Sequence, residues 1–237
     1  MPDETSACPP AGGPGPASAT AKVRVMIVDD HPIFREGLRR VINAEPDLEV
    51  SSEAASAAQA LAVASEQRPD IALVDLTLDQ SSGLDLLKDL GVRWAGLPML
   101  VLSNHDENLY AERCVRAGAR GYVMKDRPPA ELIAALREVL EGKFHLSHGI
   151  TDRILSKLGQ GTGSIAGDLT EQLSDRELQV FELYGRGRTT RQIAGILHLS
   201  VKTVESHRDH IKRKLGFPDS AALVHAAVHW IESQHGL

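Results

Sequence analysis

The stretch IALVDLT at residues 71–77 places four apolar residues directly before Asp75. Similar apolar runs occupy residues 23–28, 48–51, 99–102 and 121–124. Continuous runs of this kind are typical of strands covered on both faces, as in a parallel sheet. Apolar side chains at helical spacing follow each run, at residues 33–42, 55–64, 84–90, 108–117 and 130–140. The alternation predicts an α/β domain with a doubly wound, five-stranded parallel sheet.

The sequence on either side of this domain has a different composition. Residues 1–21 contain five Pro and three Gly, which predicts a disordered tail. The α/β domain then covers residues 22–144. Residues 145–168 form a linker with a short helix at 145–158 and a glycine-rich end. The strand pattern does not return in the last segment, residues 169–237.

This last segment predicts a small all-α domain of four helices. The spacing of a capping box occurs twice, in Ser174 with Glu177 and in Thr189 with Gln192. Two further helices are expected at residues 201–215 and 219–232. The short junction before residue 201 is typical of a helix-turn-helix, in which two helices meet at a large angle.

The composition is that of a globular protein, with 237 residues, 42% hydrophobic and 24% charged. No run approaches the roughly 18 apolar residues of a membrane span. Asp3 and Glu4 are followed by a Pro/Gly-rich run in place of an apolar segment, which argues against a secretory signal. With only Cys8 and Cys114, the chain offers neither a disulfide framework nor a cysteine-based metal site. We therefore expect a cytoplasmic protein with no membrane partner.

The net charge of −6 conceals a local excess of basic residues. Residues 1–167 carry 17 basic and 23 acidic side chains, whereas residues 168–237 carry nine of each. Within that neutral part, residues 186–214 hold eight basic and only two acidic side chains, and this segment is called the basic stripe below. Such a local excess predicts a polyanionic partner for the C-terminal domain alone.

Polar side chains stand at the carboxyl ends of the predicted strands, where parallel sheets bind ligands. They are Asp29, Asp30, Asp75, Ser103 and Lys125. Carboxylates packed this closely need a cation among them, and Mg²⁺ suits oxygen ligands. Lys125 and Ser103 suit a phosphoryl group, as counter-charge and hydrogen-bond donor. Asp75 is then the nucleophile that would carry the group as an acyl phosphate.

These residues resemble the motifs of a two-component receiver domain, which has a flavodoxin-like fold. The resemblance rests on Asp29-Asp30, Val74-Asp75-Leu76 with Gly83 eight residues on, Ser103, and GARGYVMKD at residues 118–126. It implies that Asp75 is the phosphoacceptor and that Ser103 and Tyr122 form a switch pair beside Lys125. It implies a metal site of Asp30, Asp75 and the Thr77 carbonyl, supported by Asp29. Asp79 departs from the family, which usually has Pro there.

The helix expected at residues 201–215 has one apolar and one polar face. Val204, Ile211 and Leu215 form its buried side. A polar, largely basic outer face fits the major groove of DNA. The outward residues are Lys202, Thr203, Glu205, Ser206, Arg208, Asp209, Lys212 and Arg213, and Arg188 and Thr189 complete the candidate DNA-binding set.

A second resemblance covers this part of the chain. LSDRE at 173–177, QIA at 192–194, VKTVESH at 201–207 and KLG at 214–216 are similar to the LuxR-type DNA-binding domain. With the receiver, the resemblance covers about residues 23–217 and points to the NarL/FixJ response regulators. It implies a recognition helix at 201–215 and a dimer contact through 219–232. Glu205 and Asp209 stand where some relatives have Lys, which predicts a different operator.

The sequence thus predicts a transcription regulator, and not an enzyme, that binds double-stranded DNA and uses Mg²⁺. A partner histidine kinase would phosphorylate Asp75, and the active form would be a homodimer on an operator of two half-sites. Two alternatives stay open: DNA binding that is independent of phosphorylation, and an Mg²⁺-dependent phosphohydrolase. The hydrolase lacks support from an Asp-x-Asp pattern, because residues 75–77 read DLT. We further expect the unphosphorylated receiver to cover the basic stripe.

Overall fold

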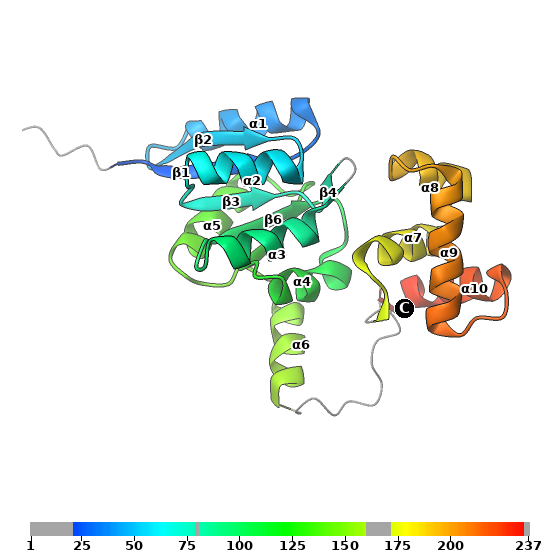
Figure 1. The fold of residues 1–237 in the computed structure, drawn as a ribbon. Coiled ribbons are helices and arrows are strands. Elements are labelled where there is room, and N and C mark those ends of the chain that lie inside the picture. The colour runs from blue at the N-terminus through cyan, green and yellow to red at the C-terminus, as the bar shows by residue number, and fades with distance from the viewer. Residues whose placement is uncertain (1–20, 79–80, 160–171, 235–237) are drawn as a thin grey trace, which may run out of the picture.

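The computed structural model describes residues 21–78, 81–159 and 172–234. It consists of an α/β part and a helical part, and helix α6, His148–Gly159, follows the α/β part (Figure 1). This helix was expected from the sequence. The predictions for residues 1–20, for Asp79 and for the glycine-rich residues 160–167 lie outside the described residues.

Five parallel strands form the central sheet, in the order β2-β1-β3-β6-β7. They are β1 Val23–Val28, β2 Leu48–Ala54, β3 Ile71–Val74, β6 Met99–Ser103 and β7 Gly121–Met124. The predicted doubly wound sheet is therefore confirmed. A two-stranded ribbon of β4, Thr77–Leu78, and β5, Ser81–Ser82, was not predicted, because two-residue strands leave no hydrophobic pattern.

Helices cover both faces of the sheet (Figure 1). They are α1 Pro32–Asn43, α2 Ala57–Glu66, α3 Gly83–Arg93, α4 Glu107–Arg116 and α5 Pro129–Leu140. Met26 and Val28 belong to the hydrophobic cluster that includes α2, α3 and α4. Val25 and Ile27 belong to the opposite cluster, with α1 and α5. Because successive side chains of a strand point to opposite faces, both sets must be apolar, which explains the continuous runs.

The helical part contains α7 Asp175–Gly185, α8 Thr190–Ile196, α9 Val201–Leu215 and α10 Ser220–Gln234. Both predicted capping boxes are present, at the beginnings of α7 and α8. Helix α9 is capped at its C-terminal end by Gly216, whose φ of 71° lies in the left-handed region that glycine adopts without strain. The predicted helix-turn-helix is formed by α8 and α9.

The core of the helical part joins its first and last helices. The rings of Phe181 on α7 and Trp230 on α10 lie 5.6 Å apart between centroids. A Cβ added at Gly185 would lie 2.5 Å from the carbonyl oxygen of Ala227, so the two helices cross where only glycine fits. None of the helices in the described ranges is both long and apolar enough to cross a membrane.

Candidate functional site

Three of the predicted site residues meet at the carboxyl edge of the sheet. Lys125, which follows β7, places its Nζ 2.6 Å from Asp29 Oδ2 and 2.7 Å from Asp75 Oδ2. Asp29 and Asp75 follow β1 and β3, and they are only 2% and 3% exposed. One ammonium group therefore serves two buried carboxylates from neighbouring strands.

Burial and charge oppose each other at this site. Burial raises the pKa of Asp75, although the nearby Lys125 opposes this shift. Burial alone would lower the pKa of Lys125, but the Asp75 and Asp29 carboxylates hold it above its usual value. The Lys125 ammonium also lies 4.6 Å from the ring centroid of Phe34, over its face. Additional positive charge at this edge would favour the ionised form of Asp75.

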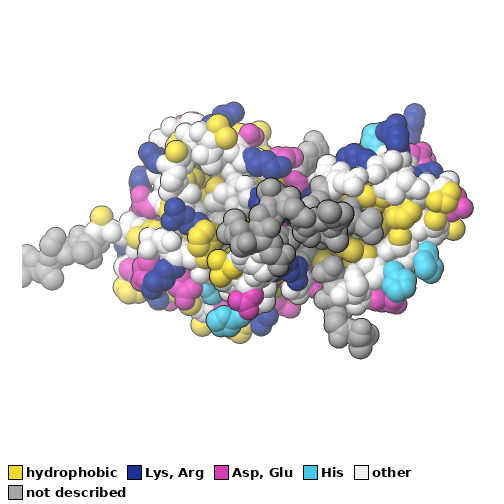
Figure 2. Space-filling view, turned by 90° about the horizontal axis from the view of Figure 1, so that it is seen from below, with side chains coloured by type: hydrophobic (Ala, Val, Ile, Leu, Met, Phe, Trp, Pro, Cys, Tyr) yellow, Lys and Arg dark blue, Asp and Glu magenta, His cyan; other side chains and the backbone are white. Residues whose placement is uncertain are grey.

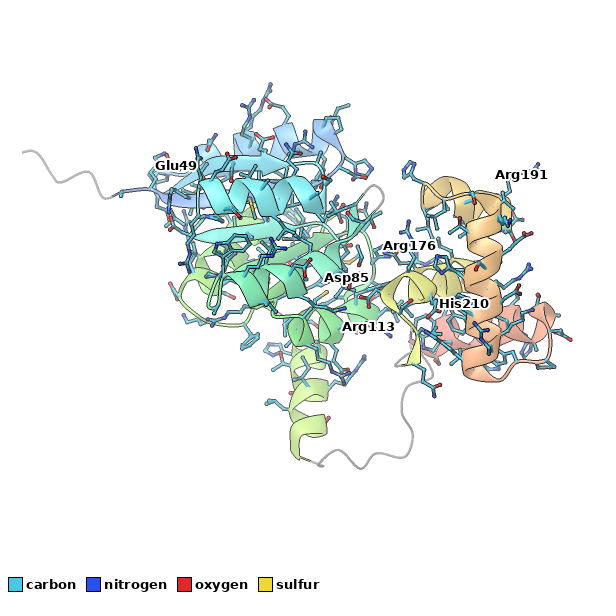
Figure 3. All side chains as sticks on the ribbon, in the orientation of Figure 1. Glu49, Asp85, Arg113, Arg176, Arg191 and His210 are labelled. Atoms are coloured by element: carbon cyan, nitrogen blue, oxygen red, sulfur yellow. The ribbon has the colours of Figure 1, made fainter. Side chains whose placement is uncertain are left out.

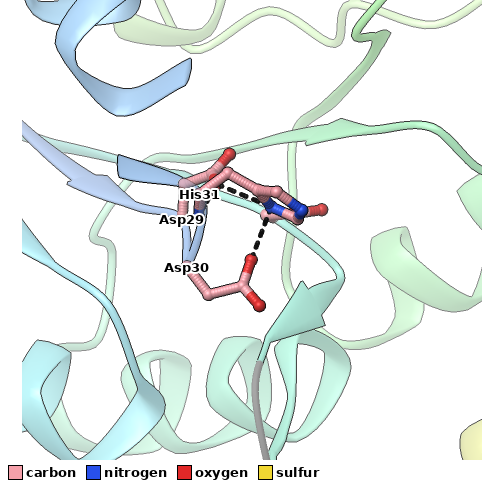
Figure 4. A group of neighbouring side chains, drawn as sticks. Asp29, Asp30 and His31 are labelled. Atoms are coloured by element: carbon pink, nitrogen blue, oxygen red, sulfur yellow. Dashed lines mark hydrogen bonds and ion pairs between the residues drawn. The ribbon is translucent and has the colours of Figure 1, made fainter. Parts of the chain in front are cut away.

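Asp30 and His31 extend the cluster toward solvent (Figure 4). His31 Nδ1 lies 2.7 Å from Asp30 Oδ1, and the His31 backbone N–H donates to Asp29 Oδ1. Potential ligand atoms of Asp29, Asp30, His31 and Asp75 all lie within 4.8 Å of one another. Three carboxylates in so small a space fit a hard divalent cation such as Mg²⁺. His31 was not a predicted ligand, and its position directly after the two acids is the signal that could have suggested it.

The loop after Asp75 is tightly packed against the strand end. The backbone N–H of Thr77 donates to Asp75 Oδ1 at 3.1 Å. Gly83 donates its N–H to the Leu76 carbonyl, and a Cβ added at Gly83 would lie 2.1 Å from the backbone oxygen of Asp75. The motif glycine is therefore required by close approach of the backbone to the candidate phosphoacceptor.

The two predicted switch residues both bond to His105, in the loop between β6 and α4. Ser103 is fully buried, and its hydroxyl accepts from the His105 backbone N–H at 3.2 Å. Tyr122 is 3% exposed, and its hydroxyl donates to the His105 carbonyl at 2.7 Å. The Tyr122 ring thus already points inward. Among the described residues, no hydrogen bond joins Ser103 to Asp75.

The outer face of α9 is accessible, as predicted from its pattern. Val204 and Ile211 are fully buried, whereas Lys202 and Arg213 are exposed. Figure 2 shows Lys and Arg side chains along one edge of the helical part, and Figure 3 shows Arg191 on the side away from the α/β part. The remaining exposed candidates are Arg188, Thr189, Glu205, Ser206 and Asp209.

Several candidate DNA-binding side chains already have partners within the chain. Lys212 Nζ lies 2.9 Å from Asp209 Oδ1, and Arg208 Nε lies 4.0 Å from the same oxygen. Thr189 caps α8 by accepting from the Gln192 backbone N–H. Thr203 bonds through its hydroxyl to Ser200, the cap residue of α9. These five candidates, Asp209 included, support the local structure in addition to any contact with DNA.

The α/β part contacts α7 rather than α9 (Figure 1). Arg113 of α4 places Nη1 2.9 Å from Asp175 Oδ1 and donates to the carbonyl of Leu173 (Figure 3). Lys88 of α3 approaches the same carboxylate at 3.4 Å. The expectation that the α/β part covers the basic stripe is therefore wrong. The α/β part contacts α7, and the α9 cations Lys202 and Arg213 are exposed.

Comparisons with known proteins agree with both parts of the fold. Residues 25–137 match the family model of the response regulator receiver domain, and residues 171–227 match that of bacterial regulatory proteins of the luxR family. The oxygen regulatory protein NreC of Staphylococcus carnosus (strain TM300) is 31% identical over 210 residues, which are 87% of this chain and 97% of that protein.

Solved structures give the same result. A LuxR-family two-component response regulator from Aurantimonas sp. SI85-9A1 is 37% identical, with a TM-score of 0.53, over 57% of this chain and 97% of that one. The RcsB response regulator of Salmonella typhimurium is 25% identical, with a TM-score of 0.53, over 87% of this chain and 98% of that one.

Proposed function

Because this chain belongs to the two-component response regulators that join a receiver domain to a LuxR-type DNA-binding domain, we propose that Asp75 is its phosphoacceptor. A partner histidine kinase supplies the phosphoryl group, and phosphorylation controls binding of α9 to an operator. The receiver domain spans residues 22–144, the linker 145–168 and the DNA-binding domain 169–237.

The observation that supports this proposal best is the pairing of Lys125 with Asp75 at 2.7 Å in a buried site. In the transfer, a carboxylate oxygen of Asp75 attacks phosphorus, and the bond from phosphorus to the kinase histidine breaks. The imidazole nitrogen keeps the electron pair of that bond. Lys125 stabilises the negative charge of the transferred phosphoryl oxygens. The Ser103 hydroxyl, at the end of β6, is available to donate a hydrogen bond to one of them.

The donor set at this edge fits Mg²⁺. The ion would be held by Asp30, Asp75 and the carbonyl of Thr77. Asp29 would support these ligands. When bound, the ion supplies positive charge that neutralises phosphoryl oxygens. Both carboxylate oxygens of Asp29 already have partners, Oδ2 in Lys125 and Oδ1 in the His31 backbone N–H, and Asp29 is less exposed than Asp30. For this reason we assign it a supporting role.

Labelling by a small phosphodonor tests the assignment. Full-length protein is incubated with acetyl phosphate and Mg²⁺, and its intact mass is followed with time. We expect one added phosphoryl group in the wild type and none in Asp75→Asn. Equal labelling of the variant would contradict the role of Asp75. The matched control is Asp85→Asn, because Asp85 is exposed on α3 and outside the acidic cluster.

The DNA-binding proposal rests on the accessible polar face of α9. Lys202, Arg213 and Arg188 contact phosphates, while Glu205 and Ser206 face base edges. Helix α10 of two copies forms the dimer contact, so that the operator has two half-sites. Lys202→Ala should weaken binding to all sequences, measured by anisotropy of labelled duplexes. Unchanged affinity would contradict the assigned face.

Two other functions remain as outcomes of these tests. DNA affinity that does not respond to acetyl phosphate, in protein that is labelled on Asp75, would favour regulation independent of phosphorylation. The family is one of transcription regulators, and we propose that the site holds one phosphoryl group without catalytic turnover. Steady release of phosphate from a phosphomonoester in the presence of Mg²⁺ would instead indicate a phosphohydrolase.

A further inference from the structure

One imidazole joins the phosphorylation site to the DNA-binding domain. His105 Nε2 lies 3.0 Å from Thr77 Oγ1, and His105 Nδ1 lies 3.3 Å from Glu182 Oε2 on α7. Thr77 in turn donates its backbone N–H to Asp75. A side chain of the DNA-binding domain is therefore connected, through His105, to the loop that follows the proposed phosphoacceptor.

Glu182 is a buried carboxylate with partners on both sides of the domain boundary. It is 2% exposed, it accepts from the Tyr110 hydroxyl at 2.8 Å, and Arg186 lies 2.7 Å away. Burial alone would raise the pKa of Glu182, but hydrogen bonds from His105 and Tyr110 hold it below its usual value. An ionised group in such a place strongly resists loss of its partners. Glu182 therefore fixes the position of the two receiver side chains that it binds.

The position of His105 in turn affects the groups around the phosphorylation site. A carboxylate can only accept a hydrogen bond, so the contact with Glu182 requires a proton on His105 Nδ1. His105 Nε2 lies within hydrogen-bond distance of the Thr77 hydroxyl, which can either donate or accept. The backbone of the same residue bonds to Ser103 and Tyr122, the proposed switch pair. Its ring also packs against Tyr110, with centroids 4.6 Å apart. One contact from α7 thus restrains the whole loop between β6 and α4.

We propose that Glu182 is a positioning residue for the phosphorylation site, which holds this loop in its unphosphorylated arrangement and slows phosphorylation of Asp75. The inference rests on the proposed function of Asp75. A phosphoryl group draws the Ser103 hydroxyl and the Thr77 loop toward its oxygens, and the His105–Glu182 contact opposes that movement. The loop must loosen this contact as the phosphoryl group is transferred, and for that reason the contact lowers the rate. At equilibrium, linkage makes phosphorylation weaken the contact by the same factor by which the contact disfavours the phosphorylated form.

The rate of labelling by acetyl phosphate in full-length protein tests the proposal. In this reaction Asp75 attacks phosphorus, the bond to the acetate oxygen breaks, and acetate leaves with its electron pair. Glu182→Gln preserves the shape of the side chain but removes its charge, and we expect an initial rate roughly fivefold higher or more. The affinity of Glu182→Gln for duplex DNA of mixed sequence should be equal to or higher than that of the wild type, because no residue of α9 takes part in the contact with His105.

The matched control is Asp175→Asn, which removes the ion pair of Arg113 across the same boundary without touching His105. This pair has no contact with His105, so we expect a labelling rate within about twofold of the wild type. Tyr110→Phe is a second variant, which keeps the Glu182 charge and removes one of its hydrogen bonds. It should raise the rate less than Glu182→Gln does, and it replaces that variant if thermal denaturation shows that Glu182→Gln is unfolded.

A double-mutant cycle distinguishes coupling through the Glu182–His105–Thr77 connection, called the relay here, from a general loosening of the contact between the domains. Thr77 and Glu182 share no direct hydrogen bond or ion pair in the described structure, so their substitutions should act independently unless His105 couples them. We expect Thr77→Ala to add little to the rate of Glu182→Gln, whereas multiplicative effects would overturn the relay.

The outcomes distinguish this inference from the function on which it rests. An unlabelled wild type, or a labelled Asp75→Asn, would remove the proposed phosphoacceptor. A normally labelled wild type with a Glu182→Gln rate that is unchanged, lower or equal to that of Asp175→Asn would overturn the role of Glu182 alone.

Discussion

The salt dependence of DNA binding can be worked out from the ion pairs of the basic stripe. Arg186 is paired with Glu182 at 2.7 Å and Lys214 with Glu177 at 2.6 Å. Lys212 is paired with Asp209 at 2.9 Å. A cation that is neutralised within the chain releases fewer counterions from DNA than a free one does. The eight basic side chains of the stripe are therefore not equivalent.

Four cations of the stripe are exposed and have no ion pair among the described residues. They are Arg188, Arg191, Lys202 and Arg213. Each phosphate contact contributes about −0.9 to the slope of log affinity against log salt, so four contacts give about −3.6 per copy. Raising the salt concentration fourfold, from about 50 to about 200 mM, should then lower the affinity of one copy about 150-fold.

Fluorescence anisotropy with a short duplex of mixed sequence measures this slope without knowledge of the operator, and sedimentation gives the number of copies bound. Arg191→Ala should reduce the slope by about 0.9, because it removes one free cation. Lys212→Ala is the matched control, and it should leave the slope nearly unchanged. A slope near zero would refute the DNA-binding face. A slope near −7 for one copy would refute the distinction between paired and free cations, since about eight contacts would then be made.

Further predictions concern the two functional surfaces and their support. Lys125→Ala should still be labelled by acetyl phosphate but should lose the gain in DNA affinity, because the counter-charge rather than the acceptor is removed. Gly83→Ala should slow labelling, since its Cβ would lie 2.1 Å from the backbone oxygen of the phosphoacceptor. Gly185→Ala forces α7 and α10 apart and should lower the free energy of unfolding in urea by about 1–3 kcal/mol. Glu205→Ala should change base preference in a selection from random duplexes, with a discrimination of about 1–3 kcal/mol lost at one base pair.

The fold was predictable because its elements obey strong periodic rules. The runs at residues 71–74 and 121–124 have the bounds of β3 and β7, since buried parallel strands are apolar throughout. The capping box of Ser174 with Glu177 marked the beginning of α7, because its hydrogen bonds need that spacing. The ribbon of β4 and β5 lacked any such signal.

The candidate phosphorylation site was predictable for a different reason. Residues at the carboxyl ends of parallel strands are brought to one edge by topology alone, so Asp29, Asp75 and Lys125 could be placed together without coordinates. Nothing comparable indicated Glu182. An acid on a helix surface is usually solvated, whereas Glu182 is buried and bonds to the Tyr110 hydroxyl of α4, a partner that the sequence does not indicate.

The relation between the two domains is thus the part that the sequence could not supply. The sequence predicts a receiver that covers the basic stripe, but no pattern in it indicates which helix of the C-terminal domain the receiver contacts. The structure instead joins them through α7, by specific short contacts to Tyr110, His105 and Arg113. Attraction between exposed charges is largely screened beyond about 10 Å at 0.1 M salt, whereas buried contacts are screened much less. Coupling between phosphorylation and DNA binding should therefore persist at salt concentrations that weaken DNA binding itself, because it depends on buried contacts.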